Sequence, residues 1–179
     1  MRAGGSFLAI AIPAAAALAA TPAHAATSET AVKAAFLPRF ARYVSWPANA
    51  SPRASEPFVL CVVGRDPFGP SLDNASRTQS VDGRRIVVRR IGSAADGRGC
   101  HIAFIQGSRT QPAGQMLAAF GRMPVLTVTD AGNGGQRGII HFSIVSGRVR
   151  FFIDEAGAAQ RGLTISSRLL ALAVGVRQR

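Results

Sequence analysis

Two continuous apolar runs constrain the fold of this chain more than any other feature of its sequence. Apolar side chains fill every position of residues 58–63 and all but the first position of residues 101–105. A strand without polar alternation is buried on both faces, which is typical of a parallel sheet with helices on either side. Gly64 follows the first run directly and predicts its end. The two runs therefore predict an α/β fold.

The remaining elements alternate in the same way. We expect strands over residues 85–91 and 125–128, a hairpin of residues 139–145 and 149–154 around Ser146-Gly147, and helices opened by Asp66 and Pro67, over 115–120, over 155–160 and after Ser166 or Ser167. The fold class is thus a single α/β domain. Its sheet is mixed and mostly parallel, ends in an antiparallel hairpin, and has helices on both faces.

The predicted first helix of the mature chain contains a proline, which disfavours a helix interior. Val32, Phe36, Phe40 and Tyr43 recur at helical spacing and predict an amphipathic helix. Pro38 lies inside this pattern. Because proline lacks a backbone donor, it predicts a kink or a division of the helix near this position.

The first 25 residues have the three regions of a cleavable secretory signal peptide. Arg2 supplies the positive start, and residues 7–20 form an apolar run shorter than the roughly 18 residues of a membrane span. An Ala-x-Ala pattern then predicts cleavage after Ala25 or Ala26. The alternative is a buried helix or an uncleaved anchor. We expect residues 1–25 to be the signal peptide and residues 26–179 to be one exported domain.

The mature chain is strongly basic. The formal charge of +12 falls to +11 without Arg2, and Lys33 is the only lysine, so arginine carries almost all of it. Such a charge indicates nucleic acid, an anionic membrane surface or an acidic partner. Export argues against nucleic acid, so we expect no nucleic-acid partner.

Two cysteines, Cys61 and Cys100, remain in a chain expected to enter an oxidising compartment. We expect one disulfide between them, which would close a loop of about 40 residues. The alternative is two separate buried thiols. The cysteines and the histidines His101 and His141 lack the close spacing of a metal-ligand motif, so we expect no metal site.

The sequence shows no catalytic set and no cofactor motif. It lacks a Gly-x-Ser-x-Gly elbow and a phosphate-binding loop of the usual spacing. Asp66 and Asp130 each follow a strand, where α/β folds bind ligands, and could line one crevice. Alternatively, Asp66 caps a helix and Asp130 a turn. These observations favour a binding or interaction module over an enzyme. We also expect no cofactor.

Several segments, taken in order, also indicate a family. They are residues 32–37, Phe40-Ala41 and Trp46-Pro47; residues 58–64 with Cys61 and residues 66–69; residues 125–128; residues 138–142; residues 149–151; and residues 158–170, which include Gly162-Leu163. Each segment alone is unspecific, but their order and spacing resemble the YfiR-like periplasmic proteins over residues 31–173.

The resemblance implies a periplasmic α/β domain that forms a homodimer and is not an enzyme. It implies a repressor that binds the periplasmic sensor domain of an inner-membrane diguanylate cyclase, and so controls cyclic-di-GMP signalling and biofilm formation. Repression in the family responds to redox state through disulfides. Cys61 and Cys100 resemble the first of two pairs, and the chain has no cysteines for the second.

A regulator that binds a partner protein needs an exposed apolar patch with a polar rim. We expect Phe152 on the outer face of the hairpin to supply the apolar part, and Asp154, Glu155 and Arg168 to supply the rim. The alternative is that these residues belong to an intramolecular core. Two other functions stay open: a small-molecule sensor for another membrane signalling protein such as a sensor kinase, and a hydrolase or transferase built on the two crevice aspartates.

Overall fold

The structure is a computed structural model that describes residues 23–53, 55–132 and 135–178, with side chains described from residue 29 onward. Residues 1–22 of the expected signal peptide lie outside the described residues. The expected cleavage positions, Ala25 and Ala26, fall in the first turn of the helix α1 (Ala23–Phe40).

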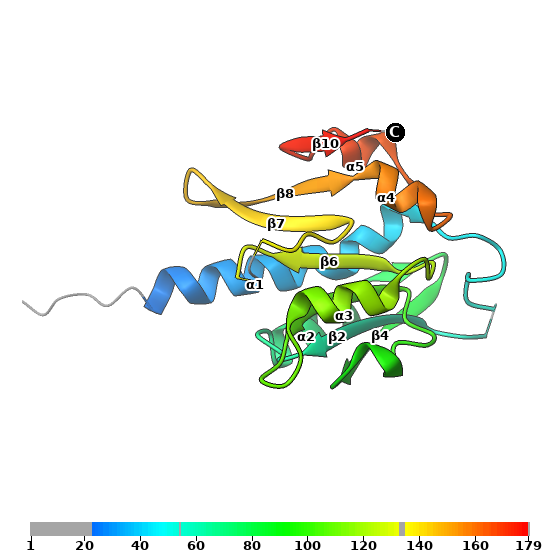
Figure 1. The fold of residues 1–179 in the computed structure, drawn as a ribbon, viewed down its shortest axis with the longest axis horizontal. Coiled ribbons are helices and arrows are strands. Elements are labelled where there is room, and N and C mark those ends of the chain that lie inside the picture. Colours follow the sequence, from blue (N-terminus) through cyan, green and yellow to red (C-terminus); the bar gives the residue numbers. More distant parts are fainter. Residues whose placement is uncertain (1–22, 54, 133–134, 179) are drawn as a thin grey trace, which may run out of the picture.

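An eight-stranded sheet forms the centre of the described chain (Figure 1). In order across the sheet, the strands are β10 (Gly175–Arg177), β8 (Arg148–Asp154), β7 (Ile140–Val145), β6 (Leu126–Asp130), β5 (Ile102–Gly107), β2 (Phe58–Gly64), β4 (Arg84–Ile91) and β3 (Ser80–Val81). The run from β4 to β7 is parallel, and so is the pair of β8 with β10. The pairs of β7 with β8 and of β3 with β4 are antiparallel. The predicted mixed, mostly parallel sheet is confirmed.

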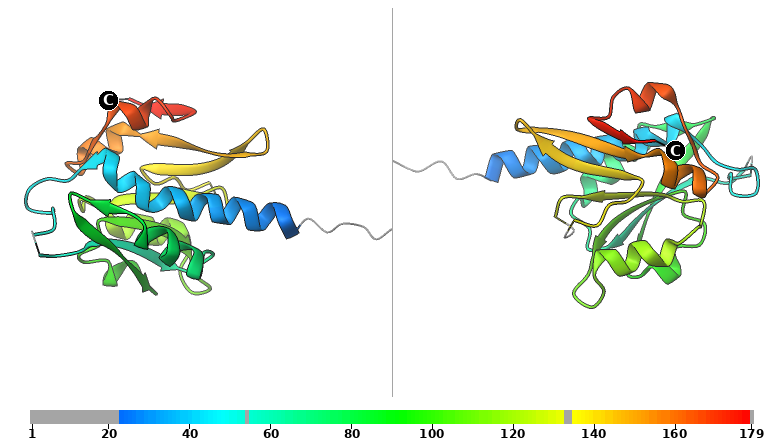
Figure 2. Two further views of the ribbon diagram at one scale, coloured as in Figure 1. Left: turned by 180° about the vertical axis from the view of Figure 1, so that it is seen from behind. Right: turned by 45° about the horizontal axis from the view of Figure 1, so that its top comes forward.

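Helices cover both faces of the sheet, as predicted. The long helix α1 and α2 (Pro70–Arg77) lie on one face, and α3 (Ala113–Phe120) lies on the other, as Figure 2 shows from behind. The remaining elements are the 3-10 helices η1 (Ala41–Tyr43) and η2 (Ala94–Asp96), the helices α4 (Glu155–Gln160) and α5 (Ser167–Leu170), and the small sheet of β1 (Val44–Ser45) and β9 (Thr164–Ile165).

Each face of the sheet has its own hydrophobic core. On the α1 face, Phe40 packs against Phe142 and Phe151, with ring centroids 5.7 and 5.3 Å apart. On the α3 face, Met116 and Phe120 of α3 are fully buried against the sheet. Because both faces are covered, the continuous apolar runs of β2 and β5 have no exposed side.

Pro38 does not divide the first helix, so that half of the prediction is wrong; a kink there stays a prediction. Helix α1 continues through Pro38 to Phe40 and passes directly into η1. Pro38 lies close to the end of α1, so it removes only one late hydrogen bond of the helix. Burial of Leu37 and Phe40, which are 0% and 1% exposed, holds this last turn in place.

Two other details of the prediction need correction. Helix α2 begins at Pro70 with Gly69 as its N-cap, so neither Asp66 nor Pro67 opens it. Asp66 instead accepts a hydrogen bond of 2.7 Å from the backbone N–H of Phe68, which forms a turn before the helix. The last helix, capped by Ser166 as expected, ends at Leu170, and the chain then forms β10 beside β8.

The predicted hairpin of β7 and β8 is present, with Ser146 and Gly147 both at positive φ (49° and 69°). Its distal half projects beyond the neighbouring strands (Figure 1). Among the described residues, β6 pairs only with residues 140–142 of β7, and β10 only with residues 152–154 of β8. Residues 143–145 and 148–150 therefore pair with each other alone.

Candidate partner-binding groove

The two adjacent phenylalanines of β8 lie on opposite faces of the sheet. Phe151 is buried on the α1 face. Phe152 lies on the other face, where the guanidinium carbon of Arg137 stands 5.1 Å from the centre of its ring. Gly175 of β10 passes so close that a Cβ there would lie 2.9 Å from the ring. A helix thus covers Phe151, while an arginine and an edge strand cover Phe152 only partly.

Phe152 lies in a hollow that we call the arginine groove. It consists of two adjoining cavities of about 560 and 190 Å³, which share the side chains of Arg137, Asp154 and Arg177. Arg122 and Arg161 line the smaller cavity. Among the described residues that line the groove, these four arginines face a single carboxylate, that of Asp154. The groove therefore favours an anionic occupant.

Asp154 holds the centre of the groove together. Its Oδ1 accepts a hydrogen bond of 2.8 Å from the backbone N–H of Gly157, and through this bond Asp154 caps α4. The same oxygen accepts a hydrogen bond of 2.8 Å from Nε of Arg177. Its Oδ2 pairs with Nη2 of Arg177. Burial acts to raise the pKa of Asp154, but the hydrogen bonds from Arg177 and Gly157 outweigh it and leave the pKa below its usual value. The ionised carboxylate neutralises one arginine of the groove.

Arg161 is fixed in the wall of the groove by two hydrogen bonds. Its Nε donates to the carbonyl oxygen of Gly121 at 2.8 Å, and its Nη1 donates to Oγ1 of Thr127 at 3.0 Å. Burial lowers the pKa of Arg161, and the nearby Asp154 opposes this shift. A guanidinium stays charged at neutral pH even so, which makes Arg161 a preorganised positive group.

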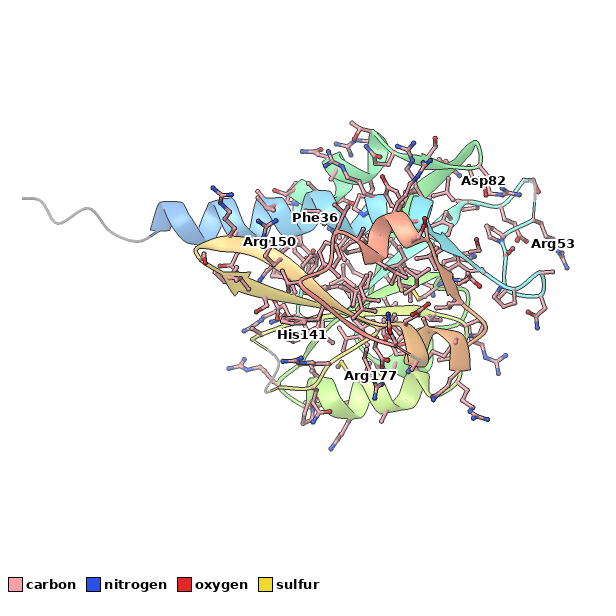
Figure 3. All side chains as sticks on the ribbon, turned by 90° about the horizontal axis from the view of Figure 1, so that it is seen from above. Phe36, Arg53, Asp82, His141, Arg150 and Arg177 are labelled. Atoms are coloured by element: carbon pink, nitrogen blue, oxygen red, sulfur yellow. A yellow bond between two sulfur atoms is a disulfide. The ribbon has the colours of Figure 1, made fainter. Side chains whose placement is uncertain are left out.

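A buried polar layer lies beneath the groove. Thr129 Oγ1 and His141 Nδ1 are 2.9 Å apart on neighbouring strands, and both side chains are buried. The same Thr129 oxygen accepts from the backbone N–H of Gly138, and Thr127 Oγ1 accepts from that of Ile139. These bonds fix the segment that carries Arg137. His141 and Arg177 both line the larger cavity, and Figure 3 labels them.

The buried histidines predict a loss of stability in mild acid. Burial is the largest cause that lowers the pKa of both His101 and His141 below the ordinary value of 6.5, and Arg137 lowers that of His141 further. A lowered pKa means that folding favours the neutral ring, so this stability is present above the unfolded pKa and is lost as the pH falls below it. The urea midpoint should therefore be lower at about pH 5 than at about pH 7.

The carboxylates of Asp73 and Asp154 do not account for this change, because hydrogen bonds to arginine hold the pKa of each below its ordinary value of 3.8. The matched control is the double variant His101→Gln/His141→Gln, whose urea midpoint should change less over the same pH range. An equally steep pH dependence in that variant would contradict the assignment to the histidines.

The structure brings together two of the four residues expected at the partner surface. Phe152 and Asp154 both line the arginine groove. Glu155 begins α4, and Arg168 is an exposed residue of α5; neither lines the groove. Both stay predictions as partner contacts.

The two aspartates expected in a ligand crevice have separate partners. Asp66 Oδ2 pairs with Arg90 Nε at 2.7 Å, and Arg90 also binds Asp73 at 2.6 Å. Asp130 Oδ2 lies 3.2 Å from Nζ of Lys33, and this pair is buried. A cavity of about 740 Å³ does open at the carboxyl ends of β2 and β5, but neither aspartate lines it.

The expected disulfide between Cys61 and Cys100 is present, with the two side chains 0% and 5% exposed. It joins β2 to the segment just before β5, inside the core of the α3 face. No group of three or more His, Cys, Asp or Glu side chains in the described residues is placed to hold a metal ion. None of the helices in the described ranges is long and apolar enough to span a membrane.

The described chain is thus an α/β domain with a basic groove on one face. Comparison with known protein families matches residues 30–174, and the chain belongs to the YfiR/HmsC-like family. The match confirms the resemblance seen in the sequence. None of the curated proteins compared with the chain matches it.

Sequence reasoning missed all four groove arginines: Arg122, Arg137, Arg161 and Arg177. They are far apart in the chain and come from different elements, so no local motif connects them. One local signal existed: Phe151 and Phe152 are adjacent on a strand and face opposite ways, so at least one of them needs cover from a helix or a partner.

Proposed function

We propose that this protein is a periplasmic regulator that binds the sensor domain of an inner-membrane diguanylate cyclase and represses it. It would thereby control cyclic-di-GMP signalling and biofilm formation. Membership of the YfiR/HmsC-like family over residues 30–174 carries this proposal. The family also supports a role in regulation rather than catalysis, and formation of a homodimer with one groove in each subunit.

Two features support a periplasmic location. The first 25 residues have the pattern of a cleavable signal peptide. The Cys61–Cys100 disulfide suits an oxidising compartment, where such bonds form and persist. Together they support an exported mature chain that begins near Ala26.

We propose that the arginine groove contacts an acidic segment of the partner's sensor domain. The four arginines supply positive charge, and Phe152 supplies an aromatic surface between them. Aromatic and arginine side chains are enriched at the centres of protein interfaces. A regulator that must dissociate gains specificity and a fast association rate from such charge complementarity.

The double variant Arg122→Glu/Arg137→Glu should abolish repression in cells. It reverses two groove charges but leaves the Asp154–Arg177 pair intact. Deleting the gene should raise cellular cyclic-di-GMP, and the wild-type gene should restore the low level while the groove variant does not. Mass spectrometry of extracted cyclic-di-GMP measures this, and co-purification of the membrane cyclase with the tagged protein gives a direct readout.

The control is Arg85→Glu/Arg148→Glu, which makes the same charge change at exposed positions outside the groove. This variant should repress fully. Full repression by the groove variant would exclude the groove as the contact. Unchanged cyclic-di-GMP after deletion of the gene would contradict repression of a diguanylate cyclase itself.

A second proposal is a small-molecule sensor that acts on another membrane signalling protein such as a sensor kinase. The cavity of about 740 Å³ at the carboxyl ends of β2 and β5 favours it, because that size is within the usual range for ligand pockets. The two functions are compatible, since the cavity and the arginine groove share no lining residue.

A further inference from the structure

The order of strands creates a topological switch point between β2 and β5. From β2 the chain passes through α2 to β4 on one side, and then returns to form β5 on the other side of β2. Helices α2 and α3, which follow β2 and β5, pack on opposite faces of the sheet. The loops after these two strands therefore diverge, and α/β folds bind ligands in the crevice that such loops leave.

Two glycines shape this crevice. A Cβ on Gly64 would lie 2.3 Å from the carbonyl oxygen of Gly107, and a Cβ on Gly107 would lie 2.8 Å from the backbone nitrogen of Ala113. Both glycines have positive φ, 89° and 74°. The backbone N–H of Arg65 donates to the carbonyl oxygen of Gly107 at 2.9 Å. The loops are thus joined at their base and open only above it, where the cavity of about 740 Å³ lies.

The cavity is positively charged. Arg65 and Arg109, one from each loop, are exposed and line it. Its described lining contains no carboxylate, because Asp66 points to Arg90 instead. The start of α3 also faces the cavity, and its N-cap, Pro112, gives no side-chain hydrogen bond to the first backbone N–H groups. These groups add positive potential at the same place.

The wall of the cavity contains an unpaired acceptor. The Oε1 atom of Gln106 is buried, and it accepts no hydrogen bond from the described residues. Gln106 also lines the cavity. A buried polar atom without a partner carries a desolvation cost, which a ligand that donates a hydrogen bond would relieve.

Hydrogen bonds within the loop after β5 close it into a turn. Ser108 Oγ accepts from the backbone N–H groups of Gln111 at 3.0 Å and Thr110 at 3.3 Å, and the backbone N–H of Ser108 donates to the carbonyl oxygen of Gln111 at 2.8 Å. Arg109 is therefore presented from a closed turn. Such preorganisation reduces the entropy that a ligand must offset on binding.

We propose that this crevice binds a small organic anion that carries a hydroxyl group. Arg65 and Arg109 bind its carboxylate or phosphate oxygens. Its hydroxyl donates to Oε1 of Gln106 once rotation of the side-chain amide turns this buried oxygen toward the cavity. The inference deepens the second proposal above, because it names the class of ligand that a sensor of this kind would take. It does not depend on repression of a cyclase.

Citrate is the probe, and isothermal titration calorimetry of the mature protein at constant ionic strength is the measurement. Citrate has three carboxylates and one hydroxyl, and tricarballylate has the same carboxylates without the hydroxyl. We expect citrate to bind, and tricarballylate to bind about tenfold more weakly, because it leaves Gln106 unpaired. The Gln106→Leu variant should bind the two anions equally. Failure of wild-type protein to bind either anion would overturn the proposal.

Variants locate the site. Arg65→Ala/Arg109→Ala should weaken citrate binding at least tenfold, since two charge-assisted hydrogen-bonding groups are lost. Arg39→Ala/Arg85→Ala, at exposed positions of α1 and β4 outside the cavity, should leave it unchanged. Equal loss in the two variants would show non-specific attraction to a basic protein and contradict the inference. Because binding is measured without a membrane partner, unchanged cyclic-di-GMP in cells would leave this result standing.

Discussion

Replacing Cys61 and Cys100 with alanine should lower the free energy of unfolding by about 4 kcal/mol. The two cysteines are 39 residues apart in the sequence, so the disulfide closes a long loop of the unfolded chain and reduces its entropy. Both side chains are buried in the core of the α3 face, so the substitution also removes apolar contacts. Urea denaturation of the oxidised mature protein and of the variant measures the difference.

The control for this experiment is the wild-type protein after reduction. It keeps both sulfur atoms but loses the cross-link, so its free energy of unfolding should fall nearly as far as that of the double alanine variant. Reduced protein that is as stable as oxidised protein would show that the covalent link contributes nothing. Mass spectrometry without reductant establishes that the starting protein is oxidised.

Lys33→Met should destabilise the fold by about 3 kcal/mol, because it leaves the buried carboxylate of Asp130 without its cation. The side chains of Lys33 and Asp130 are only 11% and 12% exposed, and Nζ lies 3.2 Å from Oδ2. Without Lys33, Asp130 Oδ1 keeps the hydrogen bond of 3.1 Å from the backbone N–H of Gly132. This neutral donor, the one that the described residues supply besides Lys33, does not compensate a buried charge.

A double-mutant cycle separates the ion pair from the helix. Lys33→Met/Asp130→Asn should recover more than half of the loss, because the uncompensated charge is gone. Arg39→Met is the matched control on the same helix: Arg39 is exposed, so the change should alter stability by less than about 0.5 kcal/mol. If the double variant is as unstable as Lys33→Met, the methylene stem of Lys33 matters and the charge pair does not.

Local sequence predicted those elements whose pattern is contained within a few consecutive residues. The apolar run of β2, the alternation of β7 and β8 and the Ser146-Gly147 turn each lie within a few residues, and all are present. Strand β10 was missed because Gly175–Arg177 is too short for a pattern and exists only through its pairing with β8. Helix α5 ends at Leu170 although Leu172 and Ala173 continue a helical spacing, because the chain turns there into β10.

The candidate site was predictable only in part, because most of its residues are far apart in the sequence. Phe152 and Asp154 are two residues apart on β8 and so face the same side of the sheet, which makes their proximity a local signal. Lys33 and Asp130 are 97 residues apart, so nothing in the sequence could indicate that the one lysine neutralises that aspartate. The arginines of the groove were visible as charge but not as a cluster, because folding alone brings them together.

The distal half of the β7–β8 hairpin carries a consequence for solubility. Its outer edges offer unpaired backbone groups to other molecules, and Ile144 and Val145 are 43% and 40% exposed beside them. Such an edge is a template for aggregation. Arg148 and Arg150 are exposed on the same short ribbon, so two approaching copies meet with like charges. These arginines act as gatekeepers, and salt weakens their protection because it screens exposed charge.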